Sequence, residues 1–188
     1  DNYDVLYGNW PKEYNDVILV LDEHNAIQSS VMYQLGLITE SEYKDINDKI
    51  TKGQKAPEIK FDYAEACGHT FYMVPSCDMY QKNADGTFTN ISENAMYQNK
   101  LMENAVKLKV SGVIRVKKGA KNPSITSAVA YSSKLTDYVI QYTDKSEIVK
   151  AQQANPQVNV LNGIKFEVPD DKSKIAETKT YISGRPIS

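Results

Sequence analysis

The sequence Gly8-Asn9-Trp10-Pro11-Lys12-Glu13-Tyr14-Asn15-Asp16-Val17-Ile18-Leu19-Val20-Leu21 gives the clearest indication of how this chain folds. Five aliphatic residues in a row, 17–21, lie between a polar run and a polar turn, which predicts a short strand buried on both faces. The single tryptophan of the chain, Trp10, stands directly before Pro11. Because proline biases the preceding residue toward extended geometry, we predict a fixed corner here, with Trp10 buried against the strand that follows.

The rest of the chain contains further strand and helix patterns around this segment. Residues 106–116 begin with alternating apolar and polar side chains, which is typical of a half-buried strand, and Gly112 within them indicates a bulge or a close backbone approach. Asp85-Gly86 predicts a turn. Strands are expected near 16–21, 69–74, 106–116 and 125–131. Helices are expected near 29–36, 41–50, 92–104 and 133–154. The predicted fold class is therefore α+β, a mixed sheet with flanking helices.

The same patterns predict which residues form the core and where the folded domain ends. We expect one domain over residues 1–166, followed by a loosely ordered tail, 167–188, where charged residues are dense and apolar residues sparse. Tyr181-Ile182 is the expected anchor of that tail. The predicted core residues are Val17, Leu19, Leu21, Leu35, Phe71, Met73, Leu108, Val110, Val113 and Ile114.

Composition excludes few classes of protein. The chain has 188 residues, 41% hydrophobic and 24% charged, which is ordinary for a globular protein. Its formal net charge of -2 gives no reason to expect a nucleic-acid partner. No apolar run approaches the ~18 residues of a membrane span. No signal peptide is visible and the first residue is Asp1, so we interpret the sequence as a processed or excised fragment.

The two cysteines, Cys67 and Cys77, are separated by nine residues. They are either a local disulfide, which would suit an oxidising compartment, or two buried free thiols. The spacing alone does not decide between these interpretations. A zinc site is not predicted, because two cysteines and two distant histidines lack the spacing of metal ligands.

No pattern in the sequence predicts catalysis, a cofactor site or a metal site. His24 lies in a polar turn and is interpreted as a solvated surface residue. His69 stands at a strand edge, where a neutral, hydrogen-bonded histidine is the simpler interpretation. Ser41 and Lys44 match a Ser-x-x-Lys pattern, but the companion motifs of serine acyl-enzymes are missing. A solvated basic loop is predicted to carry Lys117, Lys118 and Lys121.

Several segments, in this order, carry a family resemblance: Leu6-Tyr7-Gly8-Asn9-Trp10-Pro11, Asp16-Val17-Ile18-Leu19-Val20-Leu21, Tyr33-Gln34-Leu35-Gly36-Leu37, Thr70-Phe71-Tyr72-Met73-Val74-Pro75, Leu108-Lys109-Val110-Ser111-Gly112-Val113-Ile114-Arg115, Ala130-Tyr131-Ser132-Ser133-Lys134-Leu135-Thr136, Glu147-Ile148-Val149-Lys150-Ala151-Gln152 and Asn155-Pro156. Together they cover most of residues 3–163. The set resembles the extracytoplasmic domain of FtsX-like (MacB-type) ABC transporter permeases of Gram-positive bacteria. Relative to compact members of that family, the chain carries a large insertion at about 38–106.

The resemblance implies a place and a role for the chain. It implies transmembrane helices on both sides of this domain in the parent chain, and a cytoplasmic ATPase domain or subunit. A second copy of the permease is a further candidate partner. The domain itself would lie at the extracellular face of the cell membrane and would be non-catalytic. It would couple transmembrane movement to recognition of a substrate or partner outside the cell.

Tyrosines form the basis of an alternative hypothesis. The chain has 13 tyrosines but only 4 phenylalanines, and tyrosine is favoured at interfaces. A secreted or lipid-tethered binding protein could recognise a peptide or glycan through them. Within the insertion, the candidate partner surface consists of Tyr43, Tyr63, Tyr80 and Tyr97. The simpler interpretation, that these side chains only cover the core, stays open.

Overall fold

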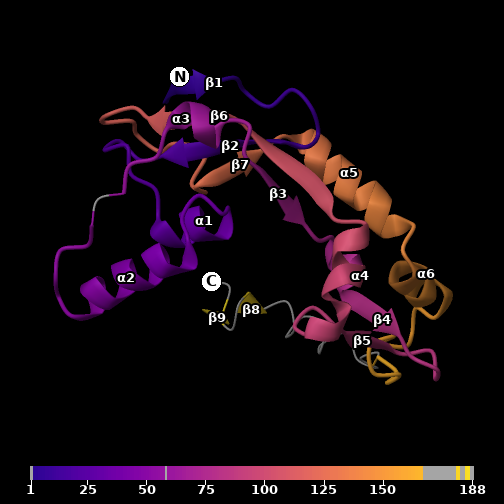
Figure 1. Cartoon of the computed structure of the whole chain (residues 1–188). Helices are drawn as coiled ribbons and strands as arrows, with labels where there is room; N and C mark the ends of the chain where they lie inside the picture. The colour runs from indigo at the N-terminus through magenta and orange to yellow at the C-terminus, as the bar shows by residue number, and fades with distance from the viewer. Residues whose placement is uncertain (1, 58, 167–180, 183–184, 187–188) are drawn as a thin grey trace.

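The computed structural model describes residues 2–57, 59–166, 181–182 and 185–186. It has the predicted α+β class, with helices flanking a mixed sheet (Figure 1). The strands are β1 (Tyr3–Gly8), β2 (Asp16–Leu21), β3 (Thr70–Met73), β4 (Tyr80–Lys82), β5 (Phe88–Asn90), β6 (Val106–Val116), β7 (Val129–Tyr131), β8 (Tyr181–Ile182) and β9 (Arg185–Pro186). The helices are α1 (Ser29–Gln34), α2 (Glu40–Thr51), α3 (Tyr63–Ala66), α4 (Gln98–Glu103), α5 (Ser133–Asp144) and α6 (Glu147–Ala154), with short 3₁₀ helices η1 (Ser76–Met79) and η2 (Ala95–Tyr97).

The long strand β6 is the centre of the main sheet. Along one edge its first half pairs with β3 and its second half with β1, both antiparallel. Along the other edge it pairs with β2 in parallel, and β2 in turn pairs antiparallel with β7. All six residues of β2 are buried, as the aliphatic run predicts. Strand β1 was not predicted from the sequence.

The two faces of this sheet are covered differently. On the first face, Val17, Leu19 and Leu21 of β2 pack with residues of α3 and α5 and with Leu35, which follows α1. On the second face, Ile18, Val20 and Ile114 form a smaller cluster, against which Tyr3, Val116, Ile125 and Ala130 pack. The covering of this second cluster therefore comes from β1, the end of β6, β7 and the 117–128 loop, and from none of the described helices.

The bulge predicted at Gly112 is confirmed. The register of β2 against β6 shifts between Val17 and Ile18, opposite Ser111. The chain leaving β1 crosses β6 here: the backbone N–H of Asn9 donates to the carbonyl oxygen of Ser111 at 2.9 Å, and the Ser111 hydroxyl donates to the carbonyl oxygen of Asn9 at 3.1 Å. Gly8 makes the turn with a φ of +69°, a conformation that favours glycine.

The prediction that Trp10 is buried is wrong. Its side chain is 46% exposed, and its ring lies edge-on to Tyr3 with ring centroids 6.4 Å apart. The physical reason is the crossing at Gly112, which carries Asn9 over β6 and leaves the Trp10 ring against Tyr3 of the second face. Because no described helix packs over that face, the indole remains half in solvent.

Four other predictions needed smaller corrections. The helix expected at 133–154 is divided into α5 and α6, because the chain breaks at Lys145 and the Ser146 side chain caps the start of α6. The strand expected at 125–131 pairs only over Val129–Tyr131, because the preceding residues form the loop that closes the second face. The helix expected at 92–104 is reduced to η2 and α4, since the Asn90 side chain accepts from Ser92 and holds a turn before them. Phe71 and Met73 are only half-buried, because β3 lies at the sheet edge. The other predicted core residues are buried.

Two groups of elements extend from the sheet (Figure 1). One is the α1–α2 pair, held together by Met32, Ile38 and Ile46. The other contains η1, α4, α6 and the β4–β5 hairpin, whose turn holds the predicted Asp85-Gly86. Residues 38–106 therefore contribute to both groups and, through β3, to the sheet. Most of the predicted tail, 167–188, lies outside the described residues; its two short strands β8 and β9 pair with each other.

Candidate functional site

An apolar groove lies on the first face of the sheet, between α1 and α5. It has a volume of about 550 Å³. Its floor contains Val17 and Leu108, which belong to the buried core. The lining residues are Val17, Gln34, Leu35, Phe71, Tyr72, Met73, Leu108, Val129, Tyr131, Leu135, Thr136, Val139 and Ile140. The groove is thus a place where the core is open to solvent.

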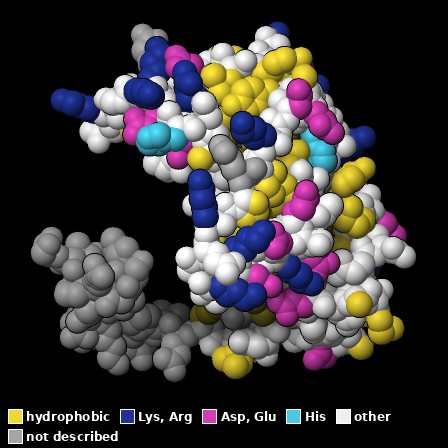
Figure 2. All heavy atoms as spheres, turned by 60° about the vertical axis from the view of Figure 1, so that its left-hand side comes forward, with side chains coloured by type: hydrophobic (Ala, Val, Ile, Leu, Met, Phe, Trp, Pro, Cys, Tyr) yellow, Lys and Arg dark blue, Asp and Glu magenta, His cyan; other side chains and the backbone are white. Residues whose placement is uncertain are grey.

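Two local features keep this groove open. Strand β3 has only four residues, so it covers little of the sheet, and Tyr131 at the end of β7 is 60% exposed. Helix α5 places Leu135 and Val139, which are one turn apart, toward the groove, while Ile140 at the next position is 53% exposed. Figure 2 shows hydrophobic side chains at several places on the face it presents. Concave apolar sites with a few polar groups are where proteins bind small ligands and segments of partners.

The chemistry of the groove is that of a contact surface. Among its lining residues, the polar side chains that face it are the Gln34 amide, the Thr136 hydroxyl and the Tyr131 hydroxyl. Tyr72 pairs with Lys107, so its side chain points to the opposite face of the sheet. No acidic, basic or thiol side chain lines it. These groups can orient a bound segment by hydrogen bonds, while the apolar walls supply most of the favourable area.

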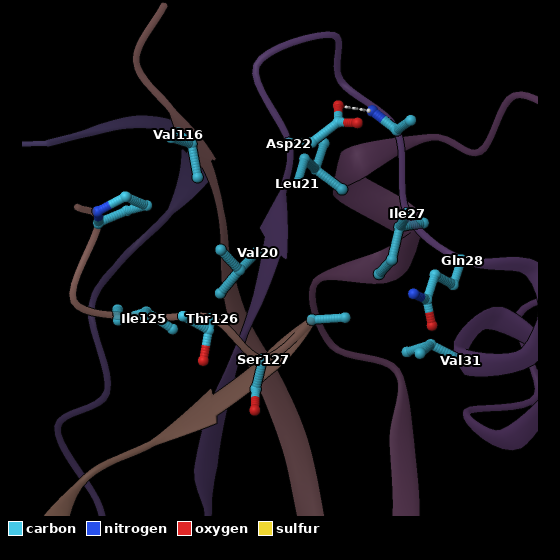
Figure 3. Close-up of a pocket in the computed structure, with 13 residues that line it drawn as sticks. Val20, Leu21, Asp22, Ile27, Gln28, Val31, Val116, Ile125, Thr126 and Ser127 are labelled. Carbon is cyan, nitrogen blue, oxygen red and sulfur yellow. Dashed lines mark hydrogen bonds between the residues drawn. The ribbon is translucent and has the colours of Figure 1, made fainter. Parts of the chain in front are cut away.

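A second hollow, of about 700 Å³, lies at the carboxyl end of β2 (Figure 3). Figure 3 shows its side chains arranged around the space between the 22–28 and 123–128 loops, with Val20, Val116 and Ile125 among them. The carboxylate of Asp22 stabilises the first of these loops, because its Oδ1 accepts from the backbone N–H of His24 and of Ala26, each at 2.8 Å. The charged side chain at this hollow, Asp22, therefore stabilises the 22–28 loop.

The buried carboxylate of Asp16 fixes the other end of β2. Its Oδ2 accepts from the backbone N–H groups of Lys12 at 3.0 Å and Glu13 at 2.9 Å, and its Oδ1 lies 3.4 Å from Lys109 Nζ. Burial alone raises the pKa of this carboxyl group. The two backbone hydrogen bonds and Lys109 together lower the pKa by more than burial raises it, so the pKa lies below its ordinary value. This carboxylate anchors the corner before β2.

The four tyrosines proposed from the sequence as a partner surface are half-buried and lie on separate elements. Tyr43 on α2 stacks on Tyr33, with ring centroids 4.8 Å apart. Tyr63 begins α3 and lies edge-on to Phe61. Tyr80 belongs to β4 and Tyr97 to η2, in the group of elements opposite α2 in Figure 1. The structure thus distributes these tyrosines over both groups of elements.

The two cysteines are free thiols in the structure. Cys67 follows α3 and is half-buried, whereas Cys77 is buried in η1. Burial raises the pKa of both thiols above the ordinary value. Asp78, next to Cys77, accepts a hydrogen bond of 2.8 Å from the Tyr142 hydroxyl, whose pKa is raised by burial and by this carboxylate. That contact ties η1 to α5.

The structure also places the histidines and the Ser-x-x-Lys pair that the sequence singled out. His24 is exposed in its turn. The Nε2 of His69 is hydrogen-bonded to the carbonyl oxygen of Leu35, as expected of a hydrogen-bonded histidine. Ser41 is exposed, and Lys44 forms an ion pair with Glu40 at 2.6 Å. Within the described ranges, no three histidine, cysteine or acidic residues gather as a metal site.

The groove residues could be found only in part from the sequence. Leu35, Phe71, Met73 and Leu108 were expected in the core, and the structure leaves the groove where that core is incompletely covered. Tyr131 and Ile140 were missed. Ile140 stands on a predicted helix beside Val139, and a sequence pattern does not reveal which of two adjacent apolar residues stays exposed.

Comparisons with known proteins leave the family of this chain open. Neither a family model, nor a curated protein, nor a solved structure matches it. None of the helices in the described part of the chain combines the length and the apolar character that crossing a membrane requires.

Proposed function

We propose that this chain is a non-catalytic extracellular module of an ABC transporter permease, which recognises a substrate or partner outside the cell membrane. The observation that carries the proposal is the apolar groove between α1 and α5, where core side chains such as Leu108 and Leu135 lie beside the exposed Tyr131 and Ile140. A partner that covers this groove removes apolar area from water, which is the main source of favourable association.

The transporter assignment rests on the family resemblance of the sequence. The segments that carry it include the end of β1 and its corner, all of β2 and most of β6, and these three strands meet at the bulge around Gly112. The other segments lie on α1, β3, β7, α5 and α6. Helix α2 and the strands β4 and β5 stand outside the resemblance.

The proposed mechanism is a shift between conformations of the parent permease. A folded module joined to transmembrane helices couples their positions, and a ligand that binds one arrangement more tightly shifts the population toward it. The implied partners are the transmembrane helices of the parent chain and a cytoplasmic ATPase domain or subunit, where ATP would be hydrolysed. A second permease copy is a further candidate.

The parent gene provides the first test. The proposal expects a stretch of ~20 predominantly apolar residues on each side of this domain. A single signal peptide or lipid-attachment sequence, without such stretches, would contradict it. That result would favour the alternative hypothesis, a secreted or lipid-tethered protein that binds a peptide or glycan.

A further inference from the structure

The second face of the sheet presents an aromatic and aliphatic surface. Trp10 is 46% exposed and Val5 is 47% exposed, and the half-buried Tyr3 lies between β6 and the indole ring of Trp10. Val5 pairs with Ile114 of the second-face cluster, so it stands on the same side of the sheet as Tyr3. We call Tyr3, Val5 and Trp10 the aromatic patch. It is separate from the groove, which opens on the first face.

A basic loop adjoins this patch. The backbone N–H of Lys117 donates to the carbonyl oxygen of Asn2, the neighbour of Tyr3. The Tyr3 hydroxyl accepts from the backbone N–H of Ile125 at 2.6 Å, which fixes the other end of the loop to the same tyrosine. Between these two points the loop carries three exposed lysines, Lys117, Lys118 and Lys121. Tyr3 thus joins the aromatic patch to the basic loop.

Two acidic side chains lie near this loop, Asp4 and Glu23. Asp4 points to the opposite face of β1, where its carboxylate forms an ion pair with Arg115 at 2.8 Å. Glu23 accepts from the backbone N–H of Gly119 at 3.3 Å and is the acidic side chain in contact with the loop. Three lysines against one glutamate leave the loop locally cationic in a chain whose formal net charge is -2.

We propose that the aromatic patch and the basic loop together bind the surface of an anionic phospholipid membrane. Trp and Tyr side chains favour the membrane–water interface, because their rings are apolar with a polar edge. Lysines beside them are attracted to anionic headgroups. The hollow at the end of β2, bounded by Val20, Val116 and Ile125, lies against the same loop and provides apolar depth next to the lysines.

The proposal extends the proposed function, which places the domain outside a cell membrane. The two fail separately, because vesicle binding involves the second face and partner recognition involves the groove on the first. A protein that does not bind vesicles can still bind a partner through its groove, and a protein whose groove binds no partner can still bind a membrane.

The single tryptophan makes the test direct, because all tryptophan emission of the chain comes from Trp10. Vesicles of mixed phosphatidylglycerol and phosphatidylcholine should shift this emission to shorter wavelengths, and lipids brominated on their acyl chains should quench it. Vesicles of phosphatidylcholine alone should do neither. High salt should weaken the binding, since it screens exposed charges.

Variants assign the binding to these residues. Lys117→Glu, Lys118→Glu and Lys121→Glu together should lower partitioning to anionic vesicles by at least about tenfold. The control is Lys52→Glu, Lys82→Glu and Lys150→Glu, which makes the same charge change at exposed lysines of other elements. Val5→Ser should weaken co-sedimentation more than Ile140→Ser, a change of comparable exposure in the groove.

Three results would overturn the proposal. One is an emission of Trp10 that anionic vesicles leave unchanged. Another is equal loss of binding in the loop variant and the control variant, with circular dichroism showing both folded. The third is a shift that depends on protein concentration without vesicles, which would assign the patch to contact with a second copy of the chain.

Discussion

The carbonyl oxygen of Asn9 lies so close to Gly112 that a Cβ atom at residue 112 would come within 2.5 Å of it. The first connection of the chain therefore crosses the central strand at a point where only hydrogen fits. Gly112→Ala should lower the free energy of unfolding by about 1–3 kcal/mol, as overpacking does. Denaturant titration measures it.

The matched control for this change is Gly119→Ala. Nothing lies within 4 Å of a Cβ added at Gly119, although its φ is +71°. The free energy of unfolding of that variant should fall by only about 1–2 kcal/mol, the strain of an alanine in the left-handed conformation. The β1–β6 pairing should stay intact. A Gly112→Ala protein as stable as the parent would show that the crossing is looser than described.

Asp16 should make stability depend on acidity. The lowered pKa of its carboxyl group in the folded state means that the charged form stabilises the fold at neutral pH. This contribution is complete above the ordinary aspartate pKa and is lost as the pH falls through the lowered one. Asp16→Asn should lower the free energy of unfolding at pH 7 by about 1–3 kcal/mol. The difference from the parent should shrink below about pH 4; a pH-independent difference would exclude this role.

The exposed position of Trp10 changes the expected effect of its removal. A fully buried tryptophan would cost about 3–5 kcal/mol on replacement by alanine. Because Trp10 keeps an edge contact to Tyr3 and is otherwise half in solvent, Trp10→Ala should cost only about 1 kcal/mol. Leu19→Ala, at a residue with 0% exposure, should cost about 2–5 kcal/mol in the same titration. Equal midpoints for the two variants would contradict this.

The thiols provide a chemical test of the structure. Because burial raises the pKa of Cys67 and Cys77, and the thiolate is the reactive form, both should be alkylated slowly at neutral pH in the folded protein and rapidly after unfolding. Mass spectrometry without reductant should find both as thiols. A mass lower by two hydrogens would show instead the disulfide that the sequence left open.

Local patterns predicted local structure well in this chain. The run Val17–Leu21 predicts β2 because a strand buried on both faces has no room for polar side chains, and Gly112 predicts the bulge because a side chain there would clash. Strand β1 was missed: its outward residues Val5 and Tyr7 are about half exposed, and the antiparallel partner that orders it lies more than a hundred residues away.

The groove and the second face depend on long-range arrangement. The parallel pairing of β2 with β6, and the attachment of β3 and β1 to different halves of one strand, decide which apolar residues stay uncovered. Phe71 and Trp10 were both predicted to be buried. Only the distances in the fold show that one borders an open groove and the other lies beside a tyrosine on a face without a described helix.

The central claim, that the groove between α1 and α5 recognises a substrate or partner for a permease, is tested by transport in the intact parent protein. Tyr131→Asp and Ile140→Asp place charges in the groove, whereas Ile50→Asp on α2 places one at a side chain that is also well exposed but outside the groove. Equal amounts of each variant in the membrane must first be confirmed. We predict that the two groove variants lose most of the transport or resistance of the parent, while Ile50→Asp retains it. Transport at the parental level in both groove variants would contradict the account.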